Sequence, residues 1–188
     1  MKIKASLRKE IGTKSSRRLR NINNVPGVIY GENILVKNIF INHNFLYLLI
    51  QKKYFYSKIY KLEISNNIEN VLLRDYQLHA YKKKILHVDF QRVNFKKKIF
   101  IKIPLYFLNY EISPAKKISS GIINYFIDNV LITCFPKYLP KFINVDLSKI
   151  KINQSIYLSD LILPKGVKLF FKKNSIVVNV HPLKNKQE

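Results

Sequence analysis

The sequence predicts a mainly β protein that is divided into two domains. Its apolar residues recur mostly with the period of two that a half-buried strand requires, and the expected strands are short. Prolines at 104, 136, 140 and 164 disfavour long helices in the second half. A chain of 188 residues could form one large domain or two modest ones. The polar, basic break at 94–98 favours two domains, at 1–94 and 95–188.

The first half is expected to contain two short helices. Residues 15–24 begin with the capping-type Ser15, and Leu19 and Ile22 lie three apart. This spacing predicts a helix whose polar face carries arginines. A second helix is expected over 44–55, where neither Gly nor Pro interrupts the chain and three apolar residues would share one face: Phe45, Leu48 and Leu49.

Strands are expected over 60–64, 71–77 and 86–92. The third is the most informative, because its side chains alternate strictly between apolar and polar. One face, which would build the core, carries Leu86, Val88 and Phe90. The opposite face would present a row of donors and acceptors from His87, Asp89 and Gln91.

Residues 26–31 predict a turn that leads into a short apolar strand ending at the second glycine. Two interpretations of Tyr30 stay open. Its ring could be half-buried in a hairpin, or its hydroxyl could contact a nucleic-acid backbone or sugar, where a rigid ring loses little entropy on binding.

The second half is expected to form a small β sandwich or barrel. Short segments rich in β-branched and aromatic residues alternate with turn signals, as such folds require. Residues 111–121 are expected to form a long loop or a helix-containing connection, and 182–188 a frayed end. The expected strands lie near 99–107, 130–135, 142–146, 167–171 and 176–180.

The charge is the strongest indication of function. The chain carries 34 Lys and Arg against 11 Asp and Glu, which gives a net charge of +23. Such a field attracts polyanions, so a nucleic acid or an anionic membrane is the expected class of partner. A compositional drift toward Lys, Ile, Asn, Tyr and Phe is the alternative explanation. Lysine runs at 82–84 and 96–98 are expected to be solvated and to attract phosphates only diffusely.

Arginine is distributed less evenly than lysine. All six arginines lie in the first half, and four of them fall within the first twenty residues. The planar guanidinium fork matches phosphate groups and guanine edges in a way that an ammonium group does not. The binding surface is therefore expected in the first half.

The sequence offers little support for an enzyme or a metalloprotein. It has no glycine-flanked serine elbow, no phosphate-binding loop and no dinucleotide fingerprint among its five glycines. Its four histidines lack metal-ligand spacing, and its single cysteine, Cys134, is expected to fill core space. No cofactor, small-molecule substrate or metal is expected. Without a signal-peptide pattern or a membrane-spanning run, we expect a cytoplasmic protein with no membrane partner.

His87 and Asp89 allow three interpretations. They could be an acid/base pair, although no nucleophile or metal cluster accompanies them, or they could form a plain surface salt bridge. They could also read bases, with the carboxylate accepting from amino groups and the imidazole donating. A carboxylate within the footprint of a polyanion needs a base donor or an arginine to compensate it, so Asp89 discriminates best between these interpretations.

Several segments together resemble a known family. In the first half they lie at 8–12, 16–20, 26–31, 77–79 and 87–90. They look like the N-terminal domain of the bacterial large-subunit ribosomal proteins numbered twenty-five, the CTC (general stress protein) family. Residues 145–148, 155–161 and 163–167 resemble the additional C-terminal domain of its longer members.

The resemblance implies a six-stranded, barrel-like RNA-binding domain with short helices, followed by a β-rich domain. It implies a structural, cytoplasmic, ribosome-associated role, with binding to the loop E region of 5S rRNA in the central protuberance. Contacts with neighbouring large-subunit ribosomal proteins stay open. Carried over position by position, the RNA contacts would come from Arg8, Ser16, Arg17, Arg18, Arg20, Tyr30, Gln77, His87 and Asp89.

The chain departs from the family pattern in a few places. Leu78 and Ala80 flank His79 where Arg and Pro are frequent, which weakens one phosphate contact that the resemblance implies, and Ser15 stands where a second glycine is frequent. Two alternative functions stay open from the residues alone. One is a general nucleic-acid-binding protein outside the ribosome, and the other is an RNA-processing enzyme.

Overall fold

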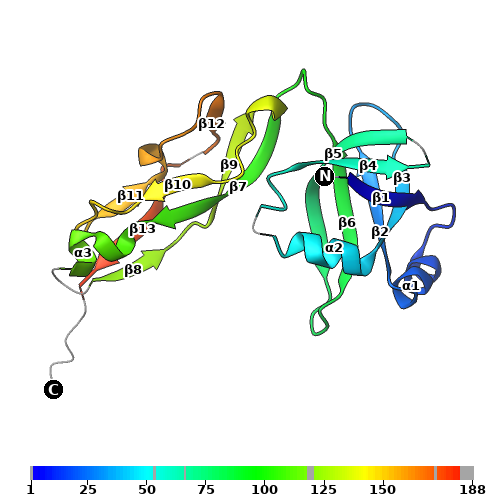
Figure 1. Ribbon diagram of the computed structural model, residues 1–188, viewed down its shortest axis with the longest axis horizontal. Helices are drawn as coiled ribbons and strands as arrows, with labels where there is room; N and C mark the ends of the chain where they lie inside the picture. Colours follow the sequence, from blue (N-terminus) through cyan, green and yellow to red (C-terminus); the bar gives the residue numbers. More distant parts are fainter. Residues whose placement is uncertain (1, 53, 66, 118–120, 172, 183–188) are drawn as a thin grey trace. The chain divides into compact units, whose positions relative to one another are not determined.

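The structure is a computed structural model that describes residues 2–52, 54–65, 67–117, 121–171 and 173–182. It confirms a mainly β protein and contains two compact units, 1–99 and 100–188 (Figure 1). Each unit is described by itself. None of the helices in the described ranges is long and apolar enough to cross a bilayer. The expected frayed end falls almost entirely outside these ranges.

The first unit is a closed barrel with the strand order β1-β3-β2-β6-β5-β4, which confirms the expected six-stranded architecture (Figure 1). Parallel pairing of β2 with β6 and of β1 with β4 joins otherwise antiparallel neighbours and closes the barrel. The elements of this unit are β1 (Lys2–Leu7), α1 (Thr13–Asn21), β2 (Asn24–Tyr30), β3 (Lys37–Asn42), α2 (His43–Ile50), β4 (Ile59–Ile64), β5 (Asn67–Leu78) and β6 (Ile85–Arg92).

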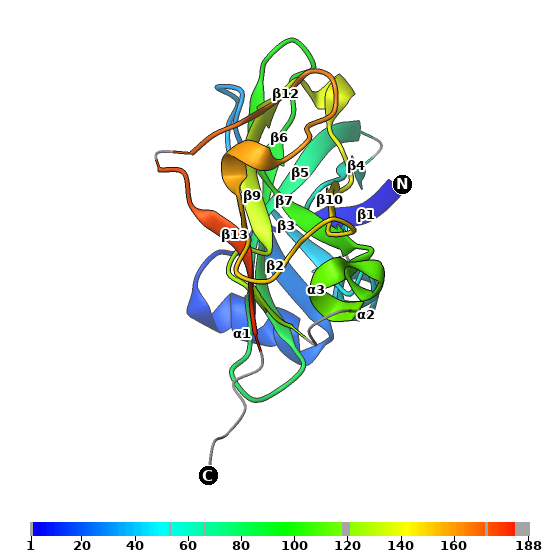
Figure 2. The ribbon, with the colours of Figure 1, turned by 90° about the vertical axis from the view of Figure 1, so that its left-hand side faces the viewer.

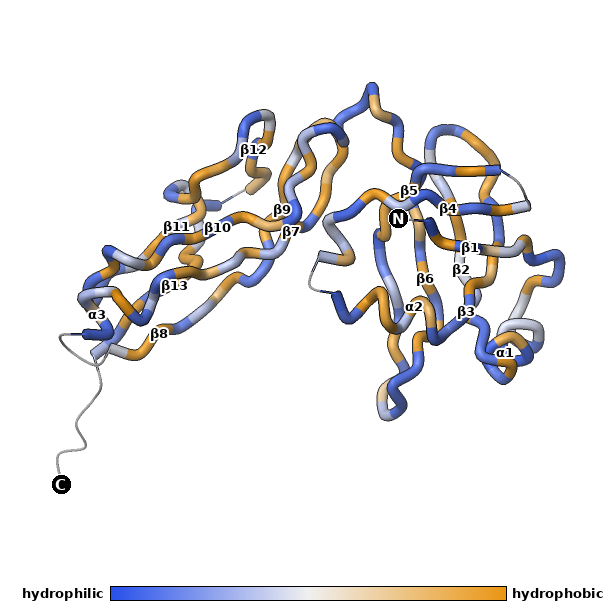
Figure 3. The backbone as a smooth tube through the Cα atoms, viewed as in Figure 1, coloured by the Kyte–Doolittle hydropathy of each residue, from blue (hydrophilic) through white to orange (hydrophobic). Residues whose placement is uncertain are grey.

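The alternation along β6 builds the core as the sequence predicts at Val88 and Phe90, but not at Leu86. Val88 and Phe90 are fully buried, whereas His87 and Asp89 are partly exposed on the opposite face. Leu86 is only partly buried at the start of the strand. Hydrophobic and hydrophilic residues alternate along the barrel strands in Figure 3, as expected where one face packs inward. The same cluster of buried residues includes Ile3, Ile29, Ile39, Ile41, Leu62 and Leu73.

Pro26 and Gly27 do not form the expected turn, because both lie inside β2. A Cβ atom on Gly27 would meet Cγ1 of Val88 at 2.6 Å and the carbonyl oxygen of Val88 at 2.7 Å. Glycine is therefore needed here for the close approach of β2 to β6. The expected end of the strand is confirmed at Gly31, whose φ of 104° interrupts the extended backbone.

Helix α1 differs from its prediction in its start and in its packing. It begins at Thr13 after Gly12, whose φ is 104°, and Ser15 lies inside the helix instead of capping it. The Ser15 hydroxyl donates to the carbonyl of Glu10 at 3.3 Å. No residue of α1 is buried, and Ile22, just beyond its end, is 67% exposed. Of the predicted apolar face, Leu19 is half-buried and Ile22 is not, so the prediction is wrong for Ile22.

Helix α2 is shorter than predicted, and of the predicted apolar face only Leu49 is buried. It begins after Asn42, whose side chain accepts from the Phe45 backbone N–H at 3.2 Å, and it ends at Ile50. Leu46 and Leu49 are its buried side chains, whereas Phe45 and Leu48 are exposed. The Asn42 cap fixes the start of the helix at His43. The buried face then contains Leu46 and Leu49, in place of Phe45, Leu48 and Leu49.

The second unit contains two small sheets, with the orders β10-β7-β9-β12 and β11-β13-β8. The five expected strands are present, and β8 and β11 are additional short ones. A 3-10 turn (Tyr110–Ile112) and α3 (Pro114–Lys117) confirm the helix-containing connection, of which 118–120 lie outside the described residues. The strands are β7 (Ile99–Leu108), β8 (Ile122–Tyr125), β9 (Asn129–Cys134), β10 (Ile143–Asp146), β11 (Ser155–Tyr157), β12 (Val167–Leu169) and β13 (Ile176–His181).

Candidate nucleic-acid interface

The outer face of strands β2, β6 and β5 brings together much of the predicted site. Residues that pair across neighbouring strands project to the same side of a sheet. His87 on β6 pairs with Gln77 on β5, and Asp89 pairs with Val28 on β2 and with Asp75 on β5. Since His87 and Asp89 face away from the core, Gln77 lies beside them on the outer face.

Tyr30 lies on the same face, one step farther along β2. It pairs with Gln91, two residues beyond Asp89 on β6. Burial raises the pKa of its hydroxyl, and the negative charge of Asp89 raises it further. The ring is therefore half-buried with its hydroxyl in the electrostatic reach of Asp89, which is compatible with both interpretations of this residue.

The register extends this face to Arg8. The backbone N–H of Arg8 donates to the carbonyl of Asn38 at 2.9 Å, and Asn38 on β3 pairs with Val28, the partner of Asp89. Arg8 therefore stands in the same transverse row as Asp89, with β3 and β2 between them. Its Nη1 donates to Oγ of Ser16 at 3.0 Å, so α1 is attached to this side of the barrel.

The arginines of α1 do not all point the same way. Arg17 and Arg20 line a pocket together with Leu86, the residue that precedes His87, and Nε of Arg20 donates to the Ser16 carbonyl at 3.1 Å. Arg18 is 78% exposed and lies 4.0 Å from Glu10. The structure thus places two guanidinium groups beside the start of β6 and leaves Arg18 apart from them.

His87 and Asp89 contact one another directly. Nδ1 of His87 lies 2.6 Å from Oδ1 of Asp89, with 29% and 35% of the side chains exposed. This distance fits the interpretation of the two residues as a surface salt bridge. It orients Nδ1–H of the ring toward the carboxylate, so that Nε2 can contact a ligand. Within the described ranges no three His, Cys, Asp or Glu side chains gather to hold a metal ion. The pair is suited to orientation and recognition.

Arg92, which is outside the predicted contact set, has a structural role in the barrel. It is 7% exposed, and its Nε donates to Glu69 at 2.8 Å. Its terminal nitrogens donate to the carbonyls of Gly31, Ile34 and Leu35 at 3.0–3.4 Å. Charge alone could not reveal this structural role, because the partner Glu69 lies 23 positions away.

Comparison with known proteins identifies relatives of both units. Residues 3–90 match the model of the Ribosomal L25p family, and residues 98–184 match that of the ribosomal protein TL5 C-terminal domain. A relative from Herminiimonas arsenicoxydans, named large ribosomal subunit protein bL25, is 48% identical over 89% of this chain and 80% of its own length.

Further relatives carry the same name. The protein from Ralstonia pickettii is 44% identical over 96% of this chain and 88% of its own length. The protein from Burkholderia multivorans is 48% identical over 90% of this chain and 84% of its own length. Identity at this level across both units, with both domain models in the order of the chain, shows that the chain belongs to the ribosomal L25p family.

Proposed function

We propose that this protein is a structural constituent of the large ribosomal subunit that binds 5S rRNA at its loop E region, in the central protuberance. The relatives are named as proteins of the large ribosomal subunit and match this chain over most of its length. The observation that carries the RNA-binding part is the outer barrel face, which joins Gln77, His87 and Asp89 to the Arg8–Ser16 contact through strand register.

Two kinds of force would act at this face. The excess of lysine and arginine supplies a salt-sensitive attraction to phosphates that is independent of sequence. The polar row along β2, β6 and β5 supplies recognition, because an ordinary A-form groove does not offer base edges in the way that a distorted, widened groove does. The contact residues of this proposal are Arg8, Ser16, Arg17, Arg18, Arg20, Tyr30, Gln77, His87 and Asp89.

Asp89 is the residue proposed to make this face selective, and Asp75 stands beside it. They pair directly across β5 and β6, so two carboxylates stand where a polyanion would approach. Such groups repel phosphates unless base amino or imino groups donate to them. We therefore propose that the face favours an RNA whose base donors match Asp89, whereas binding to a generic duplex depends on the diffuse basic charge.

The alternatives have less support. The family is one of ribosomal structural proteins, not of enzymes, which disfavours an RNA-processing reaction. A general nucleic-acid-binding protein outside the ribosome would not need carboxylates on its contact face. We place the RNA-binding domain at 1–94 and the β-rich domain at 95–188, in the cytoplasm on the ribosome, with neighbouring large-subunit proteins as further partners.

The test compares two acidic variants of the same face. Asp89→Ala is expected to weaken binding to 5S rRNA by about 1–3 kcal/mol, the scale of one good base contact, and to leave binding to an unrelated RNA duplex almost unchanged. The matched control Asp75→Ala removes the same charge from the facing position on β5 and is expected to weaken neither. Titration at fixed salt measures both affinities.

An equal loss of affinity for both RNAs in Asp89→Ala would refute this division between attraction and recognition. A second measurement tests the assembly itself. The protein should sediment with large ribosomal subunits and should leave them as salt rises, and its absence from those fractions at low salt would contradict the proposed location.

A further inference from the structure

A basic pocket lies at one end of the barrel, between α1 and the turn that joins β5 to β6. Both ribbon views place α1 and this turn at the same end (Figures 1 and 2). The pocket has a volume of about 170 Å³ and no acidic residue lines it. Its ionisable lining residues come from α1, α2 and the β5–β6 turn: Arg17, Arg20, His43, His79, Lys82 and Lys84.

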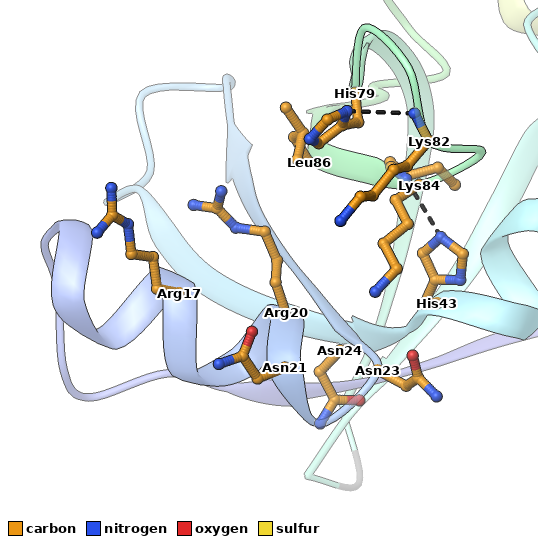
Figure 4. A pocket seen from close by; sticks show the side chains of 11 residues that line it. Arg17, Arg20, Asn21, Asn23, Asn24, His43, His79, Lys82, Lys84 and Leu86 are labelled. Carbon is orange, nitrogen blue, oxygen red and sulfur yellow. Dashed lines mark hydrogen bonds between the residues drawn. The ribbon is translucent and has the colours of Figure 1, made fainter.

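The side chains of this pocket converge from two walls. Figure 4 shows Arg20 extending from α1 toward the turn, while Lys82 and Lys84 extend from the turn into the same space. Gathering four cationic side chains around one hollow costs repulsion in the absence of a ligand. An anion with several acceptor oxygens would remove that cost, because guanidinium and ammonium groups donate strong charge-assisted hydrogen bonds to phosphates.

Two histidines fix the shape of the turn wall. Nδ1 of His79 accepts from the backbone N–H groups of Tyr81 and Lys82, each at 3.2 Å. Nε2 of His43, on α2, accepts from the backbone N–H of Ile85 at 3.2 Å, where β6 begins. A ring nitrogen that accepts cannot carry a proton, so Nε2 of His79 is the protonated nitrogen and serves as a further donor. The hydrogen bonds of His79 and His43 therefore fix the backbone conformation of the turn.

We propose that this pocket binds one backbone phosphate group of the RNA, so that α1 and the β5–β6 turn grip the backbone from two sides. The proposal rests on the proposed function and extends it, because His43, His79, Lys82 and Lys84 lie outside the contact set given above. It also assigns a specific contact to the lysine run at 82–84, which the sequence predicted to be only solvated. Arg17 and Arg20 would hold the phosphate from the helix side.

The turn itself supplies the matched control. Lys82 and Lys84 line the pocket, whereas Lys83 lies between them in sequence and does not. Lys82→Gln and Lys84→Gln are each expected to weaken RNA binding about tenfold, the scale of a hydrogen bond to a charged group. Lys83→Gln makes the same change of charge and is expected to alter affinity less than about twofold, as for a diffuse surface charge.

The salt dependence gives a second readout. The double variant Lys82→Gln, Lys84→Gln should lower the slope of log affinity against log salt by about one, as the loss of one phosphate contact requires. These measurements are made on 5S rRNA and on an unrelated duplex. If Lys83→Gln weakens binding as much as its neighbours do, the attraction is diffuse and the pocket proposal is wrong.

The source of the phosphate is tested with inorganic phosphate alone. Titration of the free protein, followed through the backbone amide NMR signals of Lys82 and Ile85, should show only weak, millimolar binding. Tight binding of inorganic phosphate that Lys84→Gln abolishes, with RNA affinity unchanged, would overturn the RNA assignment. The two proposals fail differently: equal wild-type affinity for both RNAs contradicts 5S recognition, whereas equal behaviour of the three lysine variants contradicts the pocket.

Discussion

Arg8 and Arg92 show that the surroundings of a guanidinium group decide its use. Arg8 contacts Ser16 at the outer face, and its Nε is buried without a partner in the described part of the chain. Arg92 instead donates hydrogen bonds to Glu69 and to three backbone carbonyls of the first unit. The position of His87 and Asp89 on the outer face of β6 was predictable from the alternation of apolar and polar residues and from the family pattern. The role of Arg92 was not, because its partners come from other strands and loops.

At the residue scale, His79 is expected to shape the basic turn. His79→Ala removes the acceptor for two backbone N–H groups and should cost about 1 kcal/mol, the net value of an ordinary hydrogen bond. His79→Asn keeps an acceptor near the position of Nδ1 and should retain the turn. Hydrogen exchange at the amides of Tyr81 and Lys82 measures the difference. Equal exchange in the two variants would show that the imidazole does not hold the turn.

Glu69 gives a second prediction at this scale, for acid stability. Burial alone would raise the pKa of its carboxyl, but hydrogen bonds from Lys37 and Arg92 outweigh burial and hold the pKa below its ordinary value of 4.5. A folded-state pKa below the unfolded one contributes stability that is present above pH 4.5 and is lost as pH falls through the folded value. Urea unfolding between pH 7 and pH 3 should therefore show a progressive loss below about pH 4.5.

The control for this prediction is Glu69→Gln, which cannot lose a proton. It should be less stable than wild type at pH 7 and should depend less on pH below 4.5. Other carboxyls with lowered pKa values, Glu32 and Asp146, act in the same direction, so the dependence should shrink but persist. An unchanged pH dependence in Glu69→Gln would remove Glu69 from the explanation.

At the element scale, the strands with strict alternation were predictable and the weakly patterned ones were not. β4 and β6 alternate apolar and polar residues and lie where expected. β1, β3, β8 and β11 were missed, although Ile3 and Ala5 alternate with polar residues and could have revealed β1. Pro26 and Gly27 predicted a turn but lie inside β2. The prediction failed because local propensity does not show that the parallel strand β6 approaches closely at Gly27. The pairing register of β2, β6 and β5 decides which side chains lie together on the outer face, and the sequence alone does not give that register.

Gly27 provides the prediction at the element scale. Gly27→Ala would push its Cβ against the backbone and side chain of Val88, and such overpacking is expected to cost about 1–3 kcal/mol. The displaced β6 carries His87 and Asp89, so 5S rRNA binding should weaken beyond the loss of stability. Gly12→Ala is the comparison, since its Cβ would meet nothing within 4 Å although its φ is also unfavourable for alanine. Chemical denaturation and RNA titration of the folded variants separate the two effects, and wild-type affinity in a folded Gly27→Ala protein would contradict the coupling.

At the scale of the whole molecule, each unit has the means to fold by itself. The first unit closes a barrel around its own buried cluster. The second buries its own residues, among them Ile103, Ile132, Val145, Val178 and the only cysteine of the chain, Cys134. Two compact units with separate cores are expected to unfold in separate transitions unless their interface is large.

Arg92 and Cys134 allow that expectation to be tested in the full-length chain. Arg92→Ala leaves Glu69 with Lys37 as its remaining cationic partner and removes the donors to three backbone carbonyls, and it should destabilise the first unit by about 1–3 kcal/mol, the cost of leaving buried polar groups unpaired. Burial raises the pKa of the Cys134 thiol, so a thiol reagent reacts only when the second unit opens. In the variant, the loss of barrel structure should move to lower denaturant while the onset of Cys134 labelling stays where it is in wild type. If labelling shifts together with barrel unfolding, the two units form one cooperative body, and RNA binding by the first cannot be separated energetically from the fold of the second.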